Sequence, residues 1–395
     1  MKNYISVRLL FIVLIPFIFS NCTETYPLIS NTYEEAIVIE ATITNEFKKQ
    51  QIVISKTARL EDKGIKSETG ATVSVKDDLG TVYLFKEQSN GVYFSETEFK
   101  AAPNRIYQLS IKTSKGKIYE SSKEKLTTEN QIESIIPQVV TDKVEGRGVQ
   151  IKVNSFDPTN TSKYYRYEYE ETFKIIAPDW RNKKLLVTGI KSVGFETNSA
   201  ANRICYTTKL STDIILSKTS DLKEDRVDFE VRFISDQNYI LSHRYSILVK
   251  QYVQNLESYT YRKTMKEISS TESILSPKQP GFVNGNIKCV SDSSEKAIGF
   301  FEVSSVSSKR IFFNYADLFP DERIPPYYSD CEQLEYLFCF GPGEKCRGDD
   351  LIELIRSNTA AYYGDIQRIT YFMVPIECGD CTSFSNNKIP QFWID

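Results

Sequence analysis

Hydrophobic and polar residues alternate along the part of the chain that begins near residue 35. Ile37, Ile39, Ala41 and Ile43 fall on one side of this alternation, with polar residues and one valine between them. A period of two is the pattern of a β-strand with one buried face. Similar short runs recur up to about residue 120. They predict a series of strands rather than helices.

Turn-forming residues separate these runs. Asp77-Asp78-Leu79-Gly80, Asn90-Gly91 and Lys115-Gly116 each stand between two alternating stretches. Glycine and asparagine at such positions favour the tight turns of hairpins. Six or seven short strands at this spacing predict an antiparallel sandwich of the immunoglobulin-like or transthyretin-like kind over residues 35–128.

Strand patterns continue after a polar stretch at 127–133, so we expect a larger β-rich domain over residues 129–395. The segments 297–303 and 310–314 are predicted to form a β-hairpin. Two segments favour helices, 255–271, which lacks proline and glycine, and 350–356. The fold class is therefore mainly β, with one or two helices in the second domain.

The N-terminus has the features of an export signal. Lys2 and Arg8 are followed by an apolar run over 9–19, which is too short to span a membrane. The run ends just before Cys22, at a sequence similar to the lipobox of bacterial lipoproteins. We therefore expect a signal peptide over 1–21, acylation of Cys22, and a flexible polar stalk over 22–34 that tethers the protein to a lipid bilayer.

Composition agrees with an ordinary globular protein and argues against nucleic acid as a partner. Hydrophobic residues make up 41% of the chain and charged residues 26%, which is enough apolar material for a core. The 49 basic and 52 acidic residues give a net charge of -3, with no basic block that would neutralise phosphates.

Aromatic residues are the first candidates for ligand contact, because the chain has 24 tyrosines. Tyr165, Tyr167 and Tyr169 share one face of a predicted strand, where they could stack on a sugar or peptide. The alternative is that they fill the interior of the sandwich, since tyrosine buries a large area in strands. Trp180 and Trp393 are further candidate ligand-contact residues.

Recognisable catalytic groups are scarce. Glu168 and Glu170 alternate with the tyrosines and could form the carboxylate pair of a glycosidase, although charged residues on the solvent face of a strand are commoner. His243 is the only histidine. No phosphate-binding loop, nucleophile elbow or two-histidine metal motif is present. We expect no enzymatic activity and no cofactor.

Cysteines gather toward the C-terminus. In an exported protein such a cluster predicts disulfides. A zinc site that combines Cys378 and Cys381 with two upstream thiols is the alternative. Because seven cysteines remain after Cys22, at least one stays unpaired or pairs between chains. These candidate disulfide residues are Cys205, Cys289, Cys331, Cys339, Cys346, Cys378 and Cys381.

Several segments together resemble a known family. They are Cys22, Gly70-Ala71, Gly91-Val92-Tyr93, the run 244–252, Gly285-Asn286-Ile287, 298–301, 309–312, Cys378-Gly379-Asp380-Cys381 and Pro390-Gln391-Phe392-Trp393. The chain resembles the Bacteroidota lipoproteins grouped as domain of unknown function 4249. Members are often encoded beside TonB-dependent outer-membrane receptors, and the family supplies no catalytic residue.

The resemblance implies an outer-membrane lipoprotein that is an accessory or ligand-capture partner of a β-barrel receptor. Whether it faces the periplasm or the cell surface stays open. The alternatives are a cell-surface protein that binds a glycan or peptide by itself and, further off, a carboxylate-dependent hydrolase.

Overall fold

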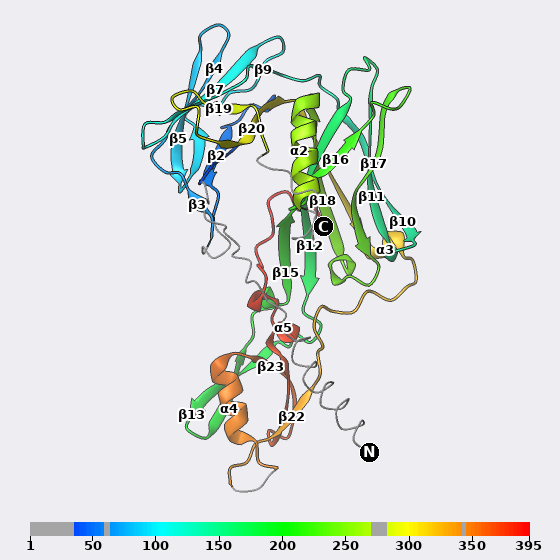
Figure 1. The fold of residues 1–395 in the computed structure, drawn as a ribbon. Coiled ribbons are helices and arrows are strands. Elements are labelled where there is room, and N and C mark those ends of the chain that lie inside the picture. Colours follow the sequence, from blue (N-terminus) through cyan, green and yellow to red (C-terminus); the bar gives the residue numbers. More distant parts are fainter. Residues whose placement is uncertain (1–34, 59–63, 270–282, 342–344) are drawn as a thin grey trace, which may run out of the picture.

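The computed structural model describes residues 35–58, 64–269, 283–341 and 345–395. The predicted signal peptide, Cys22 and the stalk lie outside the described residues. The described part is mainly β, with several sheets and a few short helices (Figure 1). The predicted fold class is thus confirmed.

The first unit, here called the N-terminal sandwich, is one long curled sheet around a single core. The sheet runs in the order β19-β8-β7-β4-β5-β6-β2-β1-β20, with β3 and β9 at its side. Alternate residues such as Ile39, Val75 and Leu109 are fully buried inside it. Its strands are β1 (Ile37–Thr44), β2 (Gln51–Lys56), β3 (Lys66–Ser67), β4 (Thr72–Asp77), β5 (Val82–Ser89), β6 (Val92–Ser95), β7 (Ile106–Lys112), β8 (Ile118–Ser121), β9 (Glu124–Lys125), β19 (Ile287–Cys289) and β20 (Ala297–Ser304).

Two strands of this sandwich come from far along the chain. β20 pairs in parallel with β1, and β19 pairs with β8. The Asn286 side chain accepts from the backbone N–H of Phe301 and donates to its carbonyl, both at 2.8 Å, which brings the two ends of the sheet together. The sandwich predicted for residues 35–128 therefore also includes residues from 287–304, which the sequence pattern assigns to the second domain.

The second unit, here called the central domain, is made of two sheets that face each other across the second core. One has the order β10-β11-β17, and the other the order β15-β12-β18-β21 with β16 beside β12. The strands are β10 (Ile132–Asp142), β11 (Gly146–Asp157), β12 (Tyr164–Ile176), β15 (Ile204–Leu210), β16 (Ile215–Lys218), β17 (Asp225–Ser235), β18 (Arg244–Gln254) and β21 (Val306–Asn314), with the short helices η1 (Ala200–Asn202), η2 (Tyr239–Leu241) and α3 (Tyr315–Leu318).

A third, smaller unit, here called the distal domain, lies at the far end of the molecule (Figure 1). Its core is built around Leu185, Leu351 and Tyr371. The elements are the hairpin β13 (Lys183–Gly189) and β14 (Ser192–Thr197), the sheet of β22 (Leu334–Leu337), β24 (Thr370–Pro375) and β23 (Ala360–Ile366), and α4 (Gly348–Ser357); the short helices α5 (Ile376–Gly379) and η3 (Cys381–Ser383) follow.

Both predicted helices are present, although residues 270–271 of the first predicted span lie outside the described residues. α2 (Leu256–Ser269) begins after Asn255, whose side chain accepts from the backbone N–H of Ser258 at 2.7 Å. A side-chain acceptor of this kind satisfies one of the unpaired N–H groups at a helix start. α2 lies between the N-terminal sandwich and the central domain (Figure 1). The second predicted helix, 350–356, lies within α4.

The predicted hairpin between 297–303 and 310–314 is wrong. β20 pairs with β1 in the N-terminal sandwich, whereas β21 pairs with β18 in the central domain. Ser305 alone separates the two strands, and its hydroxyl donates to the carbonyl of Thr128 at 2.6 Å. The chain therefore crosses between domains at Ser305, beside the earlier crossing at 127–128. Both strands have the expected alternation, but alternation does not specify the pairing partner.

Candidate functional site

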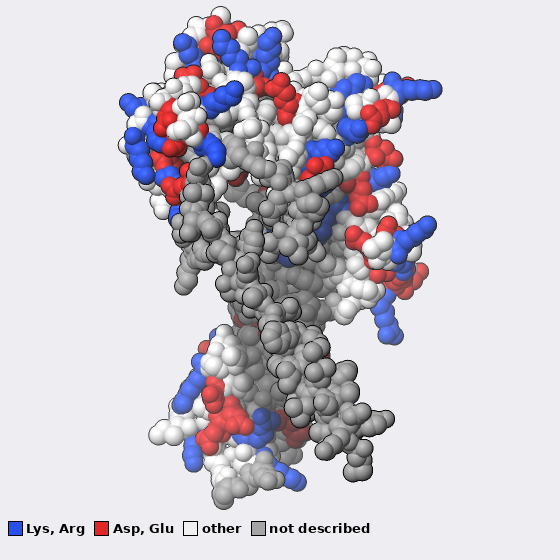
Figure 2. Space-filling view, in the orientation of Figure 1, with Lys and Arg blue, Asp and Glu red and all other residues white. Residues whose placement is uncertain are grey.

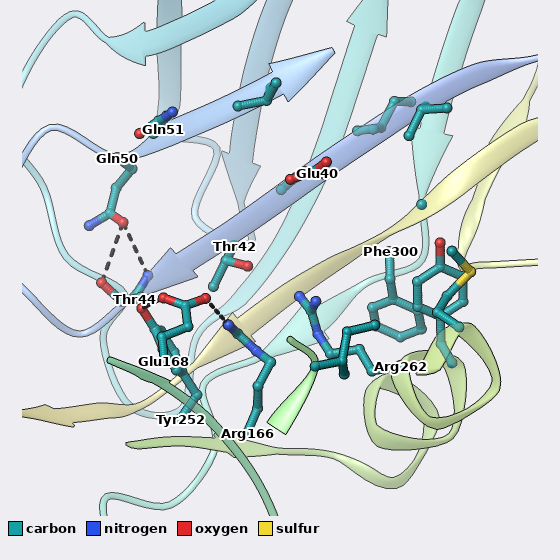
Figure 3. A pocket seen from close by; sticks show the side chains of 18 of the residues that line it. Glu40, Thr42, Thr44, Gln50, Gln51, Arg166, Glu168, Tyr252, Arg262 and Phe300 are labelled. Atoms are coloured by element: carbon teal, nitrogen blue, oxygen red, sulfur yellow. Dashed lines mark hydrogen bonds and ion pairs between the residues drawn. The ribbon is translucent and has the colours of Figure 1, made fainter. Parts of the chain in front are cut away.

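A cavity of about 780 Å³ lies between the N-terminal sandwich and the central domain. β1 and residues 48–51, which end the β1–β2 loop and begin β2, form one wall, and β12 and β18 form the opposite wall (Figure 3). α2 and residues 298–300 of β20 also line the cavity. Ligand pockets in proteins usually measure about 300–1,000 Å³ and often lie where domains meet. The size and position of this cavity suit a small ligand.

Glu302 anchors the charged side of this junction. Its carboxylate accepts from Thr42 at 2.9 Å and from Gln254 at 3.0 Å, and it also accepts from the Ser258 hydroxyl. The side chain is only 2% exposed. Strands of both domains and α2 thus meet at one buried carboxylate.

Two arginines that line the cavity neutralise this carboxylate. Arg166 Nη2 lies 2.8 Å and Arg262 Nη2 lies 3.1 Å from Glu302 Oε1. Burial alone would raise the pKa of the Glu302 carboxyl, but Arg262, Arg166 and the Ser258 hydroxyl together hold that pKa well below its usual value. The charged network is therefore a fixed part of the fold, and it orients both guanidinium groups at the edge of the cavity.

The β12–β18 register decides which side chains face the cavity. Arg166 lies opposite Tyr252 and Glu168 lies opposite Lys250. The guanidinium of Arg166 covers the Tyr252 ring at 3.9 Å, and the Tyr252 hydroxyl donates to Glu168 Oε2 at 3.0 Å. All four residues line the cavity, so this sheet presents a face of charged and aromatic groups to it.

An aromatic and sulfur-containing surface forms the α2 side. The rings of Tyr261 and Phe300 lie 5.6 Å apart, and Met265, one helical turn after Tyr261, also lines the cavity. Such surfaces pack against the apolar face of a ligand such as a sugar ring. The cavity thus combines apolar contact area with charged and hydroxyl groups.

The tyrosine platform predicted on β12 is not available to a ligand. Tyr165 is fully buried and Tyr167 is 1% exposed, both in the core of the central domain. The Tyr165 hydroxyl donates to Asp225 Oδ1 at 2.7 Å, and Tyr169 packs half-buried against the same core. The alternative interpretation, that these rings fill the interior, agrees with the structure. The rings face the second sheet of the central domain, β10-β11-β17, and not the solvent.

The two tryptophans are half-buried and neither lines the cavity. Trp180 packs against the central core, and its Nε1 donates to the carbonyl of Ser199 at 3.2 Å. Trp393 makes edge contacts with Tyr206 and Phe312. Both rings therefore contribute to packing.

The carboxylate pair suggested for hydrolysis is divided between two ion pairs. Glu168 pairs with Arg166, and Glu170 accepts from Arg310 at 2.6 Å. Only Glu168 lines the cavity. His243 is half-buried, and burial together with Lys174 lowers its pKa. Within the described residues no side chain forms a hydrogen bond with its ring.

Six of the seven cysteines form disulfides: Cys205–Cys381, Cys331–Cys378 and Cys339–Cys346. Cys289 is buried and forms no disulfide among the described residues. Because Cys378 and Cys381 belong to different disulfides, their sulfurs are not available as zinc ligands. In the described ranges no cluster of three or more histidine, cysteine, aspartate or glutamate residues could hold a metal ion.

Sequence reasoning missed Arg166, Arg262 and Glu302 as site residues. One signal was present, because Glu302 is a charge inside the otherwise apolar run Ala297-Ile298-Gly299-Phe300-Phe301-Glu302-Val303. A charge in a buried strand needs a partner. The partners themselves are 40 or more residues away in the chain, and no local pattern identifies them.

The surface visible in Figure 2 shows basic and acidic residues intermingled over all three units. Among the described helices, none has the length and apolar character needed to cross a membrane. The three cores and the cavity together define a β-rich protein of several domains with a cavity at a domain boundary.

The chain belongs to the family called "domain of unknown function (DUF4249)", whose model matches residues 23–310. The family predicted from the sequence is thus confirmed. No curated protein matches the chain. Among solved structures, trypsin-activated alpha-2-macroglobulin from Escherichia coli is 8% identical, with 57% of this chain and 15% of that chain covered and a TM-score of 0.16.

A DUF4785 family protein from Legionella pneumophila is 10% identical, with 54% of this chain and 49% of that chain covered and a TM-score of 0.14. The B domain of a biofilm-associated protein is also 10% identical, with 70% and 85% covered and a TM-score of 0.14. The chain thus spans less than half the length of the first two structures.

Proposed function

We propose that the protein is a non-enzymatic lipoprotein of the outer membrane that captures a ligand for a neighbouring β-barrel receptor. The observation that carries this proposal is the cavity of about 780 Å³ between the N-terminal sandwich and the central domain. Two domains and a helix contribute its walls, and it combines aromatic, hydroxyl and charged side chains. These are the features of a binding site.

The proposal of no enzymatic activity is supported by the network around Glu302 and Glu168, whose groups are bound to one another. Arg166 and Arg262 neutralise Glu302, and both oxygens of Glu168 accept from Arg166 and Tyr252. A general acid or base needs a proton that it can exchange with a substrate. Groups that are committed to one another in this way position a ligand rather than transfer protons.

The proposed location of the protein at the outer membrane is based on its N-terminal sequence. A lipid attached at Cys22 would hold the described domains close to a membrane through the stalk over 22–34. A tethered capture protein needs only a short diffusion path to a receptor in the same membrane. The resemblance to lipoproteins encoded beside TonB-dependent receptors supports such a receptor as the partner.

Co-purification tests the proposal. The full-length protein is isolated by an affinity tag at its C-terminus from outer membranes solubilised in a mild detergent, and the associated proteins are identified by mass spectrometry. We expect a β-barrel outer-membrane protein in near-equal amount. The matched control is Cys22→Ser, which should leave the membrane fraction and lose this partner.

Repeated isolation of the membrane-bound protein without any β-barrel protein would contradict the receptor partnership. If the same preparation still bound a glycan or peptide, the protein would instead be a binding protein that acts by itself.

A further inference from the structure

Lys250 is a cation in the cavity that has no anionic partner among the described residues. It lies half-buried on β18, directly opposite Glu168 on β12. Both oxygens of Glu168 are already occupied by Arg166 and by the Tyr252 hydroxyl. Within the described part of the chain, no carboxylate lies in ion-pair distance of the Lys250 ammonium group. The sheet therefore presents an uncompensated positive charge to the cavity.

Lys49 is a second such cation on the opposite wall. It lies exposed in the loop between β1 and β2 and lines the same cavity. Its neighbour Lys48 is paired with Glu46, whereas Lys49 has no ion pair among the described residues. The two walls, which come from different domains, each contribute one unpaired lysine.

The charge balance of the lining is positive although the whole chain carries -3. Five cationic residues line the cavity, and Glu40 and Glu168 are the two carboxylates among the lining residues. Lys48 pairs with Glu46, and Arg166 and Arg262 pair with Glu302. Lys49 and Lys250 then remain, and among the described lining residues Glu40 is the one carboxylate without an ion pair. Concave sites with an excess of one charge attract ligands of the opposite charge. The five cations are Lys48, Lys49, Arg166, Lys250 and Arg262.

The other lining groups suit a ligand rich in hydroxyls. The exposed side chains of Gln51 and Thr212 offer donors and acceptors, and Tyr261 with Phe300 offers an apolar surface. A hydroxylated ring can use both kinds of contact. Together with the unpaired lysines, these groups describe a small acidic carbohydrate-like molecule better than a neutral one.

We infer that the captured ligand is a hydroxyl-rich anion whose carboxylate or phosphate group is bound by Lys250, with Lys49 contributing from the opposite wall. This inference rests on the proposed capture function, to which it adds the charge class of the ligand. Arg166 and Arg262 orient the site but stay bound to Glu302. The binding is electrostatic and should weaken as salt screens the lysines.

Calorimetric titration of the full-length protein in a non-ionic detergent tests this inference. The carboxylate probe is trigalacturonate, and its fully methyl-esterified form is the neutral counterpart; glucose 6-phosphate and glucose form the phosphate pair. We expect at least one acidic probe to bind more tightly than its neutral counterpart. The pair that shows the difference identifies carboxylate or phosphate as the recognised group.

Lysine variants locate the binding. Lys250→Gln should weaken binding of the acidic probe about tenfold, because a charge-assisted hydrogen bond is lost. Lys49→Gln, at a more exposed position, should weaken it less. The matched control is Lys288→Gln, which removes an exposed lysine of β19 outside the cavity and should leave the affinity unchanged.

Equal binding of the neutral and acidic probes, binding that is insensitive to Lys250→Gln, or no binding of either acidic probe would each overturn the inference. The proposed function is judged separately, by the receptor co-purification. A neutral probe that alone binds would leave ligand capture intact and refute only the anionic class.

Discussion

At the scale of single residues, Glu302 decides how the two larger domains meet. It belongs to a strand of the N-terminal sandwich, while Arg166 belongs to the central domain and Arg262 to α2. A buried charge is costly unless partners neutralise it, and loss of one partner leaves the others uncompensated. The domain junction therefore depends on all three charges together.

Replacement of this carboxylate should destabilise the protein strongly. Glu302→Gln keeps the shape but leaves Arg166 and Arg262 without their counter-ion, so the free energy of unfolding should fall by about 3–5 kcal/mol. Urea denaturation at neutral pH, followed by circular dichroism, measures the loss. Glu96→Gln, at an exposed position of the sandwich, is the control and should change stability by less than about 0.5 kcal/mol. Similar losses for both variants would show that the network adds nothing.

The same carboxylate predicts a pH dependence. Its pKa in the folded protein is lowered from the usual 4.5, so the unfolded chain binds a proton more readily than the folded chain as the solution becomes acidic. The stabilisation is fully present above about pH 4.5 and is lost as the pH falls further. Between about pH 5 and pH 3 the wild-type protein should therefore lose more stability than Glu302→Gln. Parallel pH profiles of the two proteins would contradict this assignment.

At the scale of secondary-structure elements, Gly299 allows β20 to pair with β1. Its φ is +139°, and a Cβ atom at this position would lie 2.1 Å from the carbonyl oxygen of Ile39. Residues with a side chain rarely adopt such a φ. The parallel β1–β20 pairing, which forms a wall of the cavity, therefore requires glycine here.

Gly299→Ala should accordingly lower the free energy of unfolding by at least about 2 kcal/mol, through backbone strain and the clash with β1. Gly364→Ala on β23 is the matched control, because an added Cβ there meets no atom within 4 Å. Thermal denaturation of both variants provides the comparison. A Gly299→Ala protein as stable as the control would show that the two strands can separate at little cost.

At the scale of the whole molecule, disulfides connect segments that are far apart in sequence. Cys205–Cys381 joins residues 176 positions apart and ties η3, just before the C-terminus, to β15. Cys331–Cys378 closes a second loop. Such links restrict the unfolded chain, and they hold the distal domain and the C-terminal segment to the central domain.

This connectivity predicts how the thiols react. The oxidised protein, unfolded in urea without a reductant, should take up iodoacetamide at Cys289 alone among residues 35–395, since the other six sulfurs are paired. In the folded protein the burial of Cys289 should prevent even this reaction. Peptide mapping by mass spectrometry identifies the modified residue. Labelling at Cys378 or Cys381 in the unreduced protein would contradict the assigned disulfides.

Local patterns in the sequence were sufficient for the fold class and for some of the strands and helices. Alternation predicted the strand that begins at Ile37, and the helices at 255–271 and 350–356 were placed within a few residues. These features depend on neighbours in the chain, because a strand or helix is specified by which of its own faces is buried. The family also followed from local segments.

Tertiary structure alone decided which strands pair, which tyrosines are buried and where the cavity lies. β20 joins the sandwich rather than a hairpin, and Tyr165 and Tyr167 face a second sheet that their own segment does not reveal. The partners of Glu302 and of each cysteine are long-range, so they depend on how the chain returns to itself. Periodicity shows that a residue needs a partner, but only the packed fold selects which one.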